Sequence, residues 1–450
     1  MSTSSLFNPK KVPQDAQKIL EDFDKIVQNI LPLNSKQTSK LPDDIRQLSH
    51  ELTDERDTRR LGYMNEKTFL SAYTRYFAWW NLVRLTRLFS NIDITKVNLS
   101  DGDFALDIGS GPLTVVIALW LSRPELRTKK ITWYCLDISK EAMSLGEEIF
   151  LSIVAKTISA DTASDDNSDS NINPDTDINS ETRDIAPWKI IRVKGALGTS
   201  IKEKAKLVTC ANMFNEVFQS ETKPLDFLSK KYSEELSHYA KEDSSFIIVE
   251  PGVPRSARFI SCLRDSFMRR GLSIEAPCCH CESCPMDGRL LKGPHTERGT
   301  ENKKTGKWCN FAFPTKNAPE KLQKLSAAAK LPKDRAVLSF VFATPETAGI
   351  TNDVLIKHDV PSSQDKSASH SSHASLQKPA APLLLRIASD PIRIRDKIGF
   401  YACSRLGLVL YIPKKGQLVF SGDLIETKAP DQNCEPKRDF KTGAVIVEEN

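Results

Sequence analysis

The sequence predicts an α/β fold with a parallel, doubly wound sheet, because from Asp101 onward short apolar segments alternate with segments of helical character. Alternation of this kind is typical of strands joined by crossover helices. The first apolar segment, FALDIGSGPLTVVIALWL, also passes through two glycines before its helix begins. Glycines at such a turn allow the backbone to approach a ligand, and the helix N-terminus presents unpaired N–H groups. We therefore expect a ligand site at this turn.

Composition and local bias divide the 450-residue chain into several regions. It has 40% hydrophobic and 27% charged residues and a net charge of +5, and it is long enough for more than one structural unit. The predicted regions are a helical N-terminal region at 1–100, a core at 101–275 with a disordered acidic insertion at 160–186, a cysteine-rich insertion and last core strand at 276–345, a flexible linker at 359–382, and a C-terminal β module and tail at 383–450. The acidic insertion lacks aromatic residues, and such a composition cannot bury a core.

The N-terminal segment MSTSSLFNPKKVPQDAQKIL gives the expected location. It lacks the apolar stretch of a secretory signal and includes acidic residues that transit peptides avoid. No run in the chain approaches the roughly 18 apolar residues of a membrane span. We expect a cytoplasmic protein, a monomer, with no membrane partner.

The segment SAYTRYFAWWNLVRLTRLF is predicted to form an amphipathic helix. Its apolar and aromatic residues recur at helical spacing, at Tyr73, Tyr76, Phe77, Trp80 and Val83. Arginines at positions 75, 84 and 87 interleave with them. One interpretation is a helix that faces RNA, with arginines on phosphates and aromatic rings on bases. The favoured interpretation is a helix packed on the next domain with solvated arginines.

The core strands are expected in the order FALDI, KITWYCLDIS, WKIIRVKG, AKLVTCANMFNEV, SSFIIVEPGVP, LSIEAPC and RAVLSFVFATPE. The second strand ends at Asp137, 30 residues after Asp107, where a carboxylate can accept hydrogen bonds from both ribose hydroxyls. The D-x-G-x-G form from Asp107 to Gly111 resembles motif I of the class I methyltransferases, which bind S-adenosylmethionine. The predicted cofactor-binding residues are Asp107, Gly109, Ser110, Gly111, Asp137 and Asn212.

The segment after the fourth strand, NMFNEV, does not identify a methyl acceptor. It lacks the two prolines of the loop that commonly serves N-methylation of adenine or cytosine. Cys210 is a possible nucleophile for carbon 5 of a pyrimidine, but a buried core cysteine is the favoured interpretation. Asn212, Asn215 and Glu216 are candidates for the mouth of the cofactor site. The catalytic residues therefore stay unassigned.

Cysteines gather downstream of the core. Six of the ten lie between Cys278 and Cys403, which indicates metal or redox chemistry in a reducing compartment. Cys278, Cys281 and Cys284 have the C-x-x-C-x-x-C spacing of iron–sulfur loops. Four thiolates, or three with His280, also suit zinc. Spacing alone leaves both the metal and the ligand set open.

Several segments resemble the methyltransferase-like proteins associated with the mitochondrial small ribosomal subunit and their bacterial relatives. LDIGSGP, VEPGVP, APC with CP six residues on, WCNF and KIGFYACSRLG occur in the order of that family, across 62–413. The resemblance implies binding to small-subunit rRNA and a role in subunit assembly or translation, with active S-adenosylmethionine-dependent rRNA methylation as the alternative. It also implies an iron–sulfur cluster, of the 4Fe-4S type, held by Cys278, Cys284, Cys309 and Cys403.

The chain departs from the family pattern at two additional thiols, Cys279 and Cys281, and in a long basic insertion before Trp308. Contacts with rRNA phosphates are expected from Arg289, Lys292, Arg298, Lys303, Lys304, Lys307, Arg393, Arg395 and Lys397. For the residues from Arg289 to Lys307, a solvated charged loop is the alternative.

Overall fold

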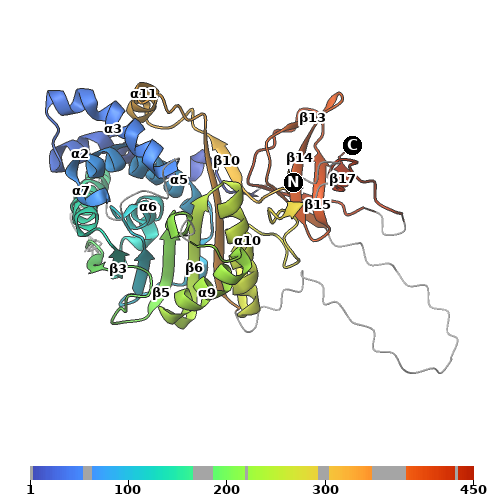
Figure 1. The fold of residues 1–450 in the computed structure, drawn as a ribbon, viewed down its shortest axis with the longest axis horizontal. Coiled ribbons are helices and arrows are strands. Elements are labelled where there is room, and N and C mark those ends of the chain that lie inside the picture. The colour runs from blue at the N-terminus through green and yellow to red at the C-terminus, as the bar shows by residue number, and fades with distance from the viewer. Residues whose placement is uncertain are drawn as a thin grey trace, which may run out of the picture.

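The computed structural model describes residues 4–53, 63–165, 186–217, 221–291, 304–346, 382–430 and 434–449. Most of the predicted acidic insertion and linker, together with Lys292, Arg298 and Lys303, lies outside these residues. Figure 1 shows a larger part, in which helices cover a sheet, beside a smaller β structure coloured red. Both ends of the chain lie at the smaller part.

An eight-stranded sheet forms the centre of the larger part. Its strands are β2 (Phe104–Ile108), β3 (Thr132–Asp137), β4 (Lys189–Lys194), β5 (Ala205–Ala211), β6 (Ala240–Pro251), β7 (Leu272–Ala276), β10 (Phe311–Pro314) and β11 (Arg335–Pro345). Their order is β10-β11-β6-β5-β2-β3-β4, with β7 also paired to β11. Strands β2 to β6 are parallel, whereas β11 runs antiparallel to β6, β7 and β10. The predicted doubly wound sheet is confirmed.

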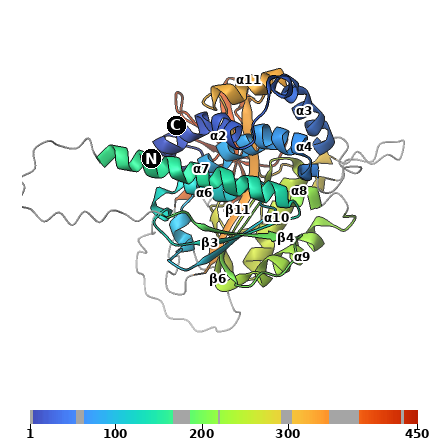
Figure 2. The same ribbon diagram turned by 90° about the vertical axis from the view of Figure 1, so that its left-hand side faces the viewer.

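Helices cover both faces of this sheet. One face carries α6 (Thr114–Ser122) and α7 (Lys140–Asp165), and the other carries α9 (Leu225–His238) and α10 (Pro254–Arg269), as Figure 2 shows from the side of α7. Shorter elements are η4 (Ile94–Val97), η5 (Pro124–Leu126) and α8 (Phe214–Val217). Every residue of α6 is buried, because the sheet covers one side of it and the N-terminal helices cover the other.

The N-terminal region is helical, as predicted. Its elements are η1 (Pro9–Lys11), α1 (Gln14–Glu21), α2 (Phe23–Ile30), α3 (Ser35–Thr53), η2 (Tyr63–Asn65), α4 (Lys67–Ala72), the π-helix η3 (Tyr73–Ala78) and α5 (Trp79–Phe89). The predicted packing of η3 and α5 on the core is confirmed. The prediction that their arginines are solvated is wrong. Arg75 donates from Nη2 to the carbonyl oxygen of Leu31 at 2.6 Å, and Arg87 donates from Nε to that of Phe7 at 2.9 Å. These guanidinium groups bond to protein carbonyls because other N-terminal segments pack over them.

The smaller part is a seven-stranded sheet in the order β1-β16-β12-β14-β15-β17, with β13 paired to β14. Its strands are β1 (Ser4–Ser5), β12 (Leu383–Ile387), β13 (Ile392–Ile394), β14 (Lys397–Ser404), β15 (Gly407–Ile412), β16 (Asp423–Thr427) and β17 (Val445–Glu448). The predicted antiparallel pairing holds except between β15 and β17, which are parallel. Strand β1 was not predicted, and it ties the N-terminal segment to the C-terminal sheet.

The chain between β7 and β11 leaves the core sheet and returns to it. It contains the cysteine-rich segment, the paired strands β8 (Leu290–Leu291) and β9 (Lys304–Thr305), then β10 and α11 (Glu320–Ala328). This segment contacts the smaller sheet, since Ala312 donates its backbone N–H to Oγ of Ser421 at 3.1 Å. None of the helices in the described ranges is long and apolar enough to cross a membrane.

Candidate functional site

The glycine turn between β2 and α6 has the backbone that only glycine adopts easily. Gly109 and Gly111 have φ angles of 70° and 48°, in the left-handed region that costs other residues energy. A Cβ on Gly109 would lie 2.7 Å from Cβ of Met213. The turn therefore lies directly against the loop that follows β5.

Asp107 lies beneath this turn and is not among the residues that line the cavity above it. It is 1% exposed, and its Oδ1 accepts a hydrogen bond from Oγ1 of Thr209 at 2.7 Å. Among the described residues its Oδ2 has no partner. Burial raises the pKa of Asp107 to about 7. Its position supports the turn from below, so the structure does not bring this predicted residue to the cavity.

Asp137, at the end of β3, faces the glycine turn. Its Oδ2 accepts from the backbone N–H of Gly111 and its Oδ1 accepts from that of Ser139, each at 2.8 Å. Burial raises the pKa of this carboxyl group. Each oxygen keeps a second lone pair, so the side chain retains capacity to accept hydrogen bonds from a ligand.

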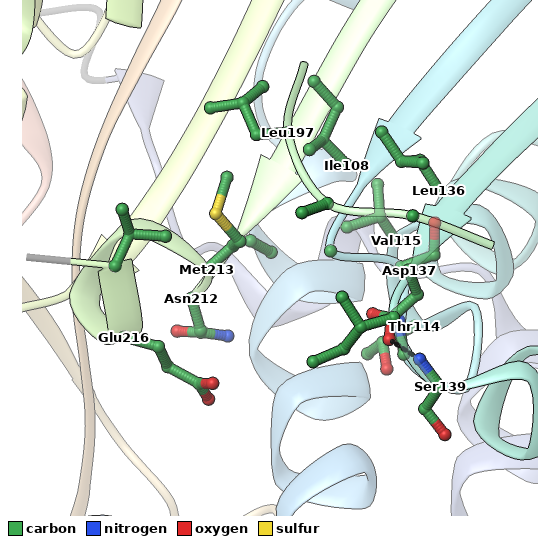
Figure 3. A pocket seen from close by; sticks show the side chains of 18 of the residues that line it. Ile108, Thr114, Val115, Leu136, Asp137, Ser139, Leu197, Asn212, Met213 and Glu216 are labelled. Carbon is green, nitrogen blue, oxygen red and sulfur yellow. Dashed lines mark hydrogen bonds between the residues drawn. The ribbon is translucent and has the colours of Figure 1, made fainter. Parts of the chain in front are cut away.

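A cavity of about 470 Å³ opens above these residues. Gly109, Ser110, Gly111, Asp137 and Asn212 all line it. Figure 3 shows Asp137 with its neighbour Ser139 on one side of the cavity and Asn212 with Met213 and Glu216 on the other. The structure therefore brings five of the six predicted cofactor-binding residues together.

The cavity also contains residues that the sequence analysis missed. Leu197, Met213 and Ser139 line it, and so does Tyr73 from the N-terminal region. Ser139 could have been predicted, because it follows the acid of the second strand by two residues. Tyr73 carried no such signal, because its approach depends on how the N-terminal helices pack.

The loop after β5 is held by the half-buried Arg84 and the buried Glu250. Asn212 has a φ of 60°, and its Oδ1 accepts from Nη2 of Arg84 at 2.8 Å. Glu250, at the end of β6, accepts from the backbone N–H groups of Phe214 at 2.9 Å and Asn215 at 3.0 Å. Burial raises the pKa of Glu250 to about 8 and lowers that of Arg84 to about 10. The loop conformation thus depends on side chains from α5 and β6.

Cys210 belongs to the interior of the sheet. It is 1% exposed, and burial raises the pKa of its thiol well above the ordinary value. A buried, protonated thiol is a poor nucleophile. The favoured prediction of a core cysteine is confirmed.

The cysteine-rich segment places several thiols in one region, where α10, β14 and the segment before β10 meet. Burial raises the pKa of Cys309, and the neighbouring groups of Cys284 and Cys278 raise it further. For Cys403 the hydrogen bond with Cys279 raises the pKa most, followed by burial and by Cys309 and Cys278. Cys309 thus lies near Cys284 and Cys278, and Cys403 lies near Cys279, Cys309 and Cys278.

Two buried arginines adjoin these thiols. Arg264 donates from Nε to Sγ of Cys278 at 3.1 Å. Arg386, from β12, donates from Nε to the carbonyl oxygen of Pro277 at 2.8 Å and from Nη1 to that of Gly422 at 2.7 Å. Neither arginine was predicted. Their positive charges favour thiolates in this region.

The thiols do not form a finished metal site. Within the ranges that the structure describes, no three side chains of His, Cys, Asp or Glu are arranged to hold a metal ion. Cys281 is exposed, whereas Cys403 is buried. The C-x-x-C-x-x-C alternative thus includes one thiol that faces solvent.

The core sheet and the cavity define the class of protein. The order β4-β3-β2-β5-β6-β11-β7, with β11 reversed, has a glycine turn after β2 and an acid at the end of β3. This arrangement is the Rossmann-like fold of the class I S-adenosylmethionine-dependent methyltransferases. The sequence profile of the family described as mitochondrial small ribosomal subunit Rsm22 matches residues 94–346. The chain belongs to that family, as its sequence motifs predicted.

Solved structures with similar folds are distant. A methyltransferase from Geobacter sulfurreducens in complex with S-adenosyl-L-homocysteine is 10% identical, over 59% of this chain and 90% of that one, with a TM-score of 0.29. A putative class I methyltransferase from Listeria monocytogenes is 12% identical, over 75% and 89%, with a TM-score of 0.29. A putative RNA methyltransferase from Pyrococcus horikoshii is 11% identical, over 64% and 90%, with a TM-score of 0.26. Because these TM-scores are low, the fold assignment rests on the strand order. No curated protein matches the chain.

Proposed function

We propose that the protein binds S-adenosylmethionine in the cavity above the glycine turn. The observation that carries this proposal is the position of Asp137, whose two oxygens accept from Gly111 and Ser139 while the side chain lines the cavity. A carboxylate held in this way is oriented to accept hydrogen bonds from the ribose hydroxyls. The N-terminus of α6 and the glycine turn offer backbone contact on the adjoining side.

The protein's role, we further propose, is to bind rRNA of the small ribosomal subunit and support subunit assembly or translation. Family membership supports association with the small subunit. Arg289 is exposed but pairs with Asp287, and the exposed arginines at positions 393 and 395 are available for phosphate contacts. Lys307, in contrast, packs over the ring of Tyr401 at 4.4 Å, and Lys397 pairs with Glu448.

An iron–sulfur cluster is the proposed occupant of the cysteine region, with Cys278, Cys284, Cys309 and Cys403 as ligands. The donor chemistry fits, because thiolates are the usual ligands of such clusters and Arg264 and Arg386 would offset part of their negative charge. The cluster would tie the C-terminal sheet to the segment that follows β7. Since no metal-binding arrangement exists among the described side chains, cluster binding would require the cysteines to move closer together.

Active rRNA methylation is the second candidate function. It is favoured by a second cavity that shares residues with the first, including Asn212 and Glu216, because an acceptor must reach the donated methyl group. The discriminating experiment is crosslinking of the protein to RNA in cells, with rRNA methylation mapped after deletion. Crosslinks to small-subunit rRNA with an unchanged methylation map would support a non-catalytic assembly role. A lost methyl group that wild type restores and Asp137→Ala does not would support catalysis.

A further inference from the structure

The second cavity adjoins the proposed cofactor site. It has a volume of about 650 Å³, within the range of about 300–1,000 Å³ that ligand sites occupy. Tyr73, Asn81, Asn212 and Glu216 line both cavities. An occupant of the second cavity would therefore lie one layer of side chains, or less, from an occupant of the first.

One wall of the second cavity is aromatic. Tyr73 and Phe77 stack with their ring centroids 5.7 Å apart and their planes at 23°, and Trp80 continues the same wall. Trp80 is fixed, because its Nε1 donates to Oγ of Ser326 at 3.1 Å. Aromatic walls of this kind accept the flat face of a planar ring.

Cationic side chains adjoin the aromatic wall. Lys333 lies just before β11 and Arg335 is the first residue of that strand. The Nζ of Lys333 lies over the ring of Trp80, 5.5 Å from its centroid. Burial of this ammonium group and the charge of Arg84 lower the pKa of Lys333 to about 8, so a bound anion would stabilise its charged form. Arg335 pairs with Asp390. Two carboxylates, Asp334 and Glu216, also line the cavity.

Arg84 connects the two cavities. It donates from Nη1 to the carbonyl oxygen of Val337 at 3.0 Å and from Nη2 to Oδ1 of both Asn81 and Asn212 at 2.8 Å. Its Nε is buried and has no partner among the described residues. The amide of Asn215 also reaches this space. Amide groups can form hydrogen bonds with the edge of a base, an aromatic ring can stack on its face, and a cationic side chain can bind the phosphate.

We propose that the second cavity binds one nucleotide unit of a single-stranded RNA, with the base on the ring of Phe77 and the phosphate at Lys333. This inference rests on the proposed function, because it places the nucleotide beside the cofactor cavity. The shared Asn212 would face both occupants. An acidic peptide is the competing occupant, since it would use Lys333 without needing the aromatic wall.

The test uses the full chain and a fluorescein-labelled single-stranded RNA of ten nucleotides, with S-adenosylhomocysteine present. Lys333→Ala and Phe77→Leu should each weaken RNA binding about fivefold to tenfold, as expected for loss of one phosphate or one stacking contact. Lys202→Ala is the matched control, because Lys202 is exposed in the segment that leads into β5 and lines neither cavity. It should leave RNA affinity unchanged.

The two proposals fail in different ways. Unchanged RNA affinity in Lys333→Ala and Phe77→Leu, with normal S-adenosylmethionine binding, would overturn the nucleotide site alone. Absence of S-adenosylmethionine binding in wild type would overturn the cofactor proposal instead. If Phe77→Leu does not fold, photocrosslinking of wild type with 4-thiouridine RNA decides, since the label should fall on the peptide that contains Phe77 and Trp80. A label elsewhere would overturn the nucleotide assignment. So would polyglutamate that displaces the RNA from wild type and from Phe77→Leu but not from Lys333→Ala.

Discussion

Arg264 donates from Nε to Sγ of Cys278 at 3.1 Å and so joins helix α10 to the first thiol of the cysteine-rich segment. Its Nη2 donates to the carbonyl oxygens of His280 and Glu282, each at 2.9 Å. The side chain is 4% exposed. A buried guanidinium that bonds to three groups of one loop holds the loop in shape and opposes the rise that burial imposes on the pKa of Cys278.

Replacement of Arg264 by Gln should therefore destabilise the protein. The expected loss is about 2–4 kcal/mol in the free energy of unfolding, because charged donors are removed from buried carbonyl groups. Urea denaturation of the purified protein measures it. Arg270→Gln is the control, since Arg270 is exposed at the end of the same helix, and it should change stability by about 0.5 kcal/mol or less. Equal losses in the two variants would contradict the role given to Arg264.

The cysteine ligands can be tested by iron content. Protein purified without oxygen should be brown, and Cys403→Ser should lose both iron and soluble yield, because Cys403 would tie β14 to the cluster. Cys281→Ser, which alters an exposed thiol, should keep both, and Cys279→Ser should keep its iron. A colourless protein with stoichiometric zinc would rule out the cluster. Iron loss in Cys281→Ser with retention in Cys403→Ser would rule out the ligand set.

The core was predictable because its signals are local. Buried parallel strands appear in the sequence as continuous apolar runs, and the glycine turn must follow β2 directly to fit against Met213. The same local reasoning placed Asp137 at the cavity. It failed for Asp107, because the sequence does not reveal whether a strand-end acid points to the ligand or beneath the turn.

Features that depend on distant partners were not predictable. Arg75 is buried and Arg87 is half-buried, and they donate to carbonyl groups of Leu31 and Phe7, although arginines on an amphipathic helix are ordinarily solvated. Strand β1 has two residues and pairs with β16 near the other end of the chain. Arg264 likewise reaches the thiols only because α10 packs against the cysteine-rich segment, and no spacing in the sequence indicates that packing.

Asp137→Ala tests the proposed cofactor site. Loss of the carboxylate should weaken S-adenosylmethionine binding by about 1–3 kcal/mol, since the ribose hydroxyls lose a charged partner. Calorimetry with the full chain measures the change, and circular dichroism checks the fold. Asp396→Ala is the control, because Asp396 is exposed beside β14. Equal affinity in wild type and Asp137→Ala would refute the assignment.

Stability should depend on pH through Asp107. Its pKa is raised by burial from 3.8 to about 7, so the native state holds the proton more tightly than the unfolded chain does. The resulting stabilisation is complete below the ordinary pKa and is lost as the pH rises through about 7. Between pH 3.8 and about 7, ionisation of Asp107 should lower the free energy of unfolding by up to about 1.4 kcal/mol for each pH unit.

Asp107→Asn should flatten the curve. Asparagine is uncharged at every pH and keeps an oxygen that can accept from Thr209. Urea denaturation at several pH values between 3.8 and about 7 measures how steeply the free energy of unfolding falls with pH in each protein. A variant slope as steep as that of wild type would assign the dependence to other buried acids, of which Glu250 is the first to test, because its pKa is raised to about 8.

Binding to rRNA should depend on salt through the exposed arginines of the C-terminal sheet. Arg393 lies in β13 and Arg395 lies in the turn between β13 and β14, and both are exposed, so phosphates can reach both. Each phosphate contact on a single strand contributes a slope of about −0.7 to the logarithm of affinity against that of salt concentration. The double variant Arg393→Ala and Arg395→Ala should therefore reduce the slope by about 1.4 in magnitude. Lys202→Ala with Lys204→Ala removes the same charge from the exposed segment before β5 and should preserve the slope. A similar reduction in both double variants would indicate that net charge, and not this sheet, governs the association.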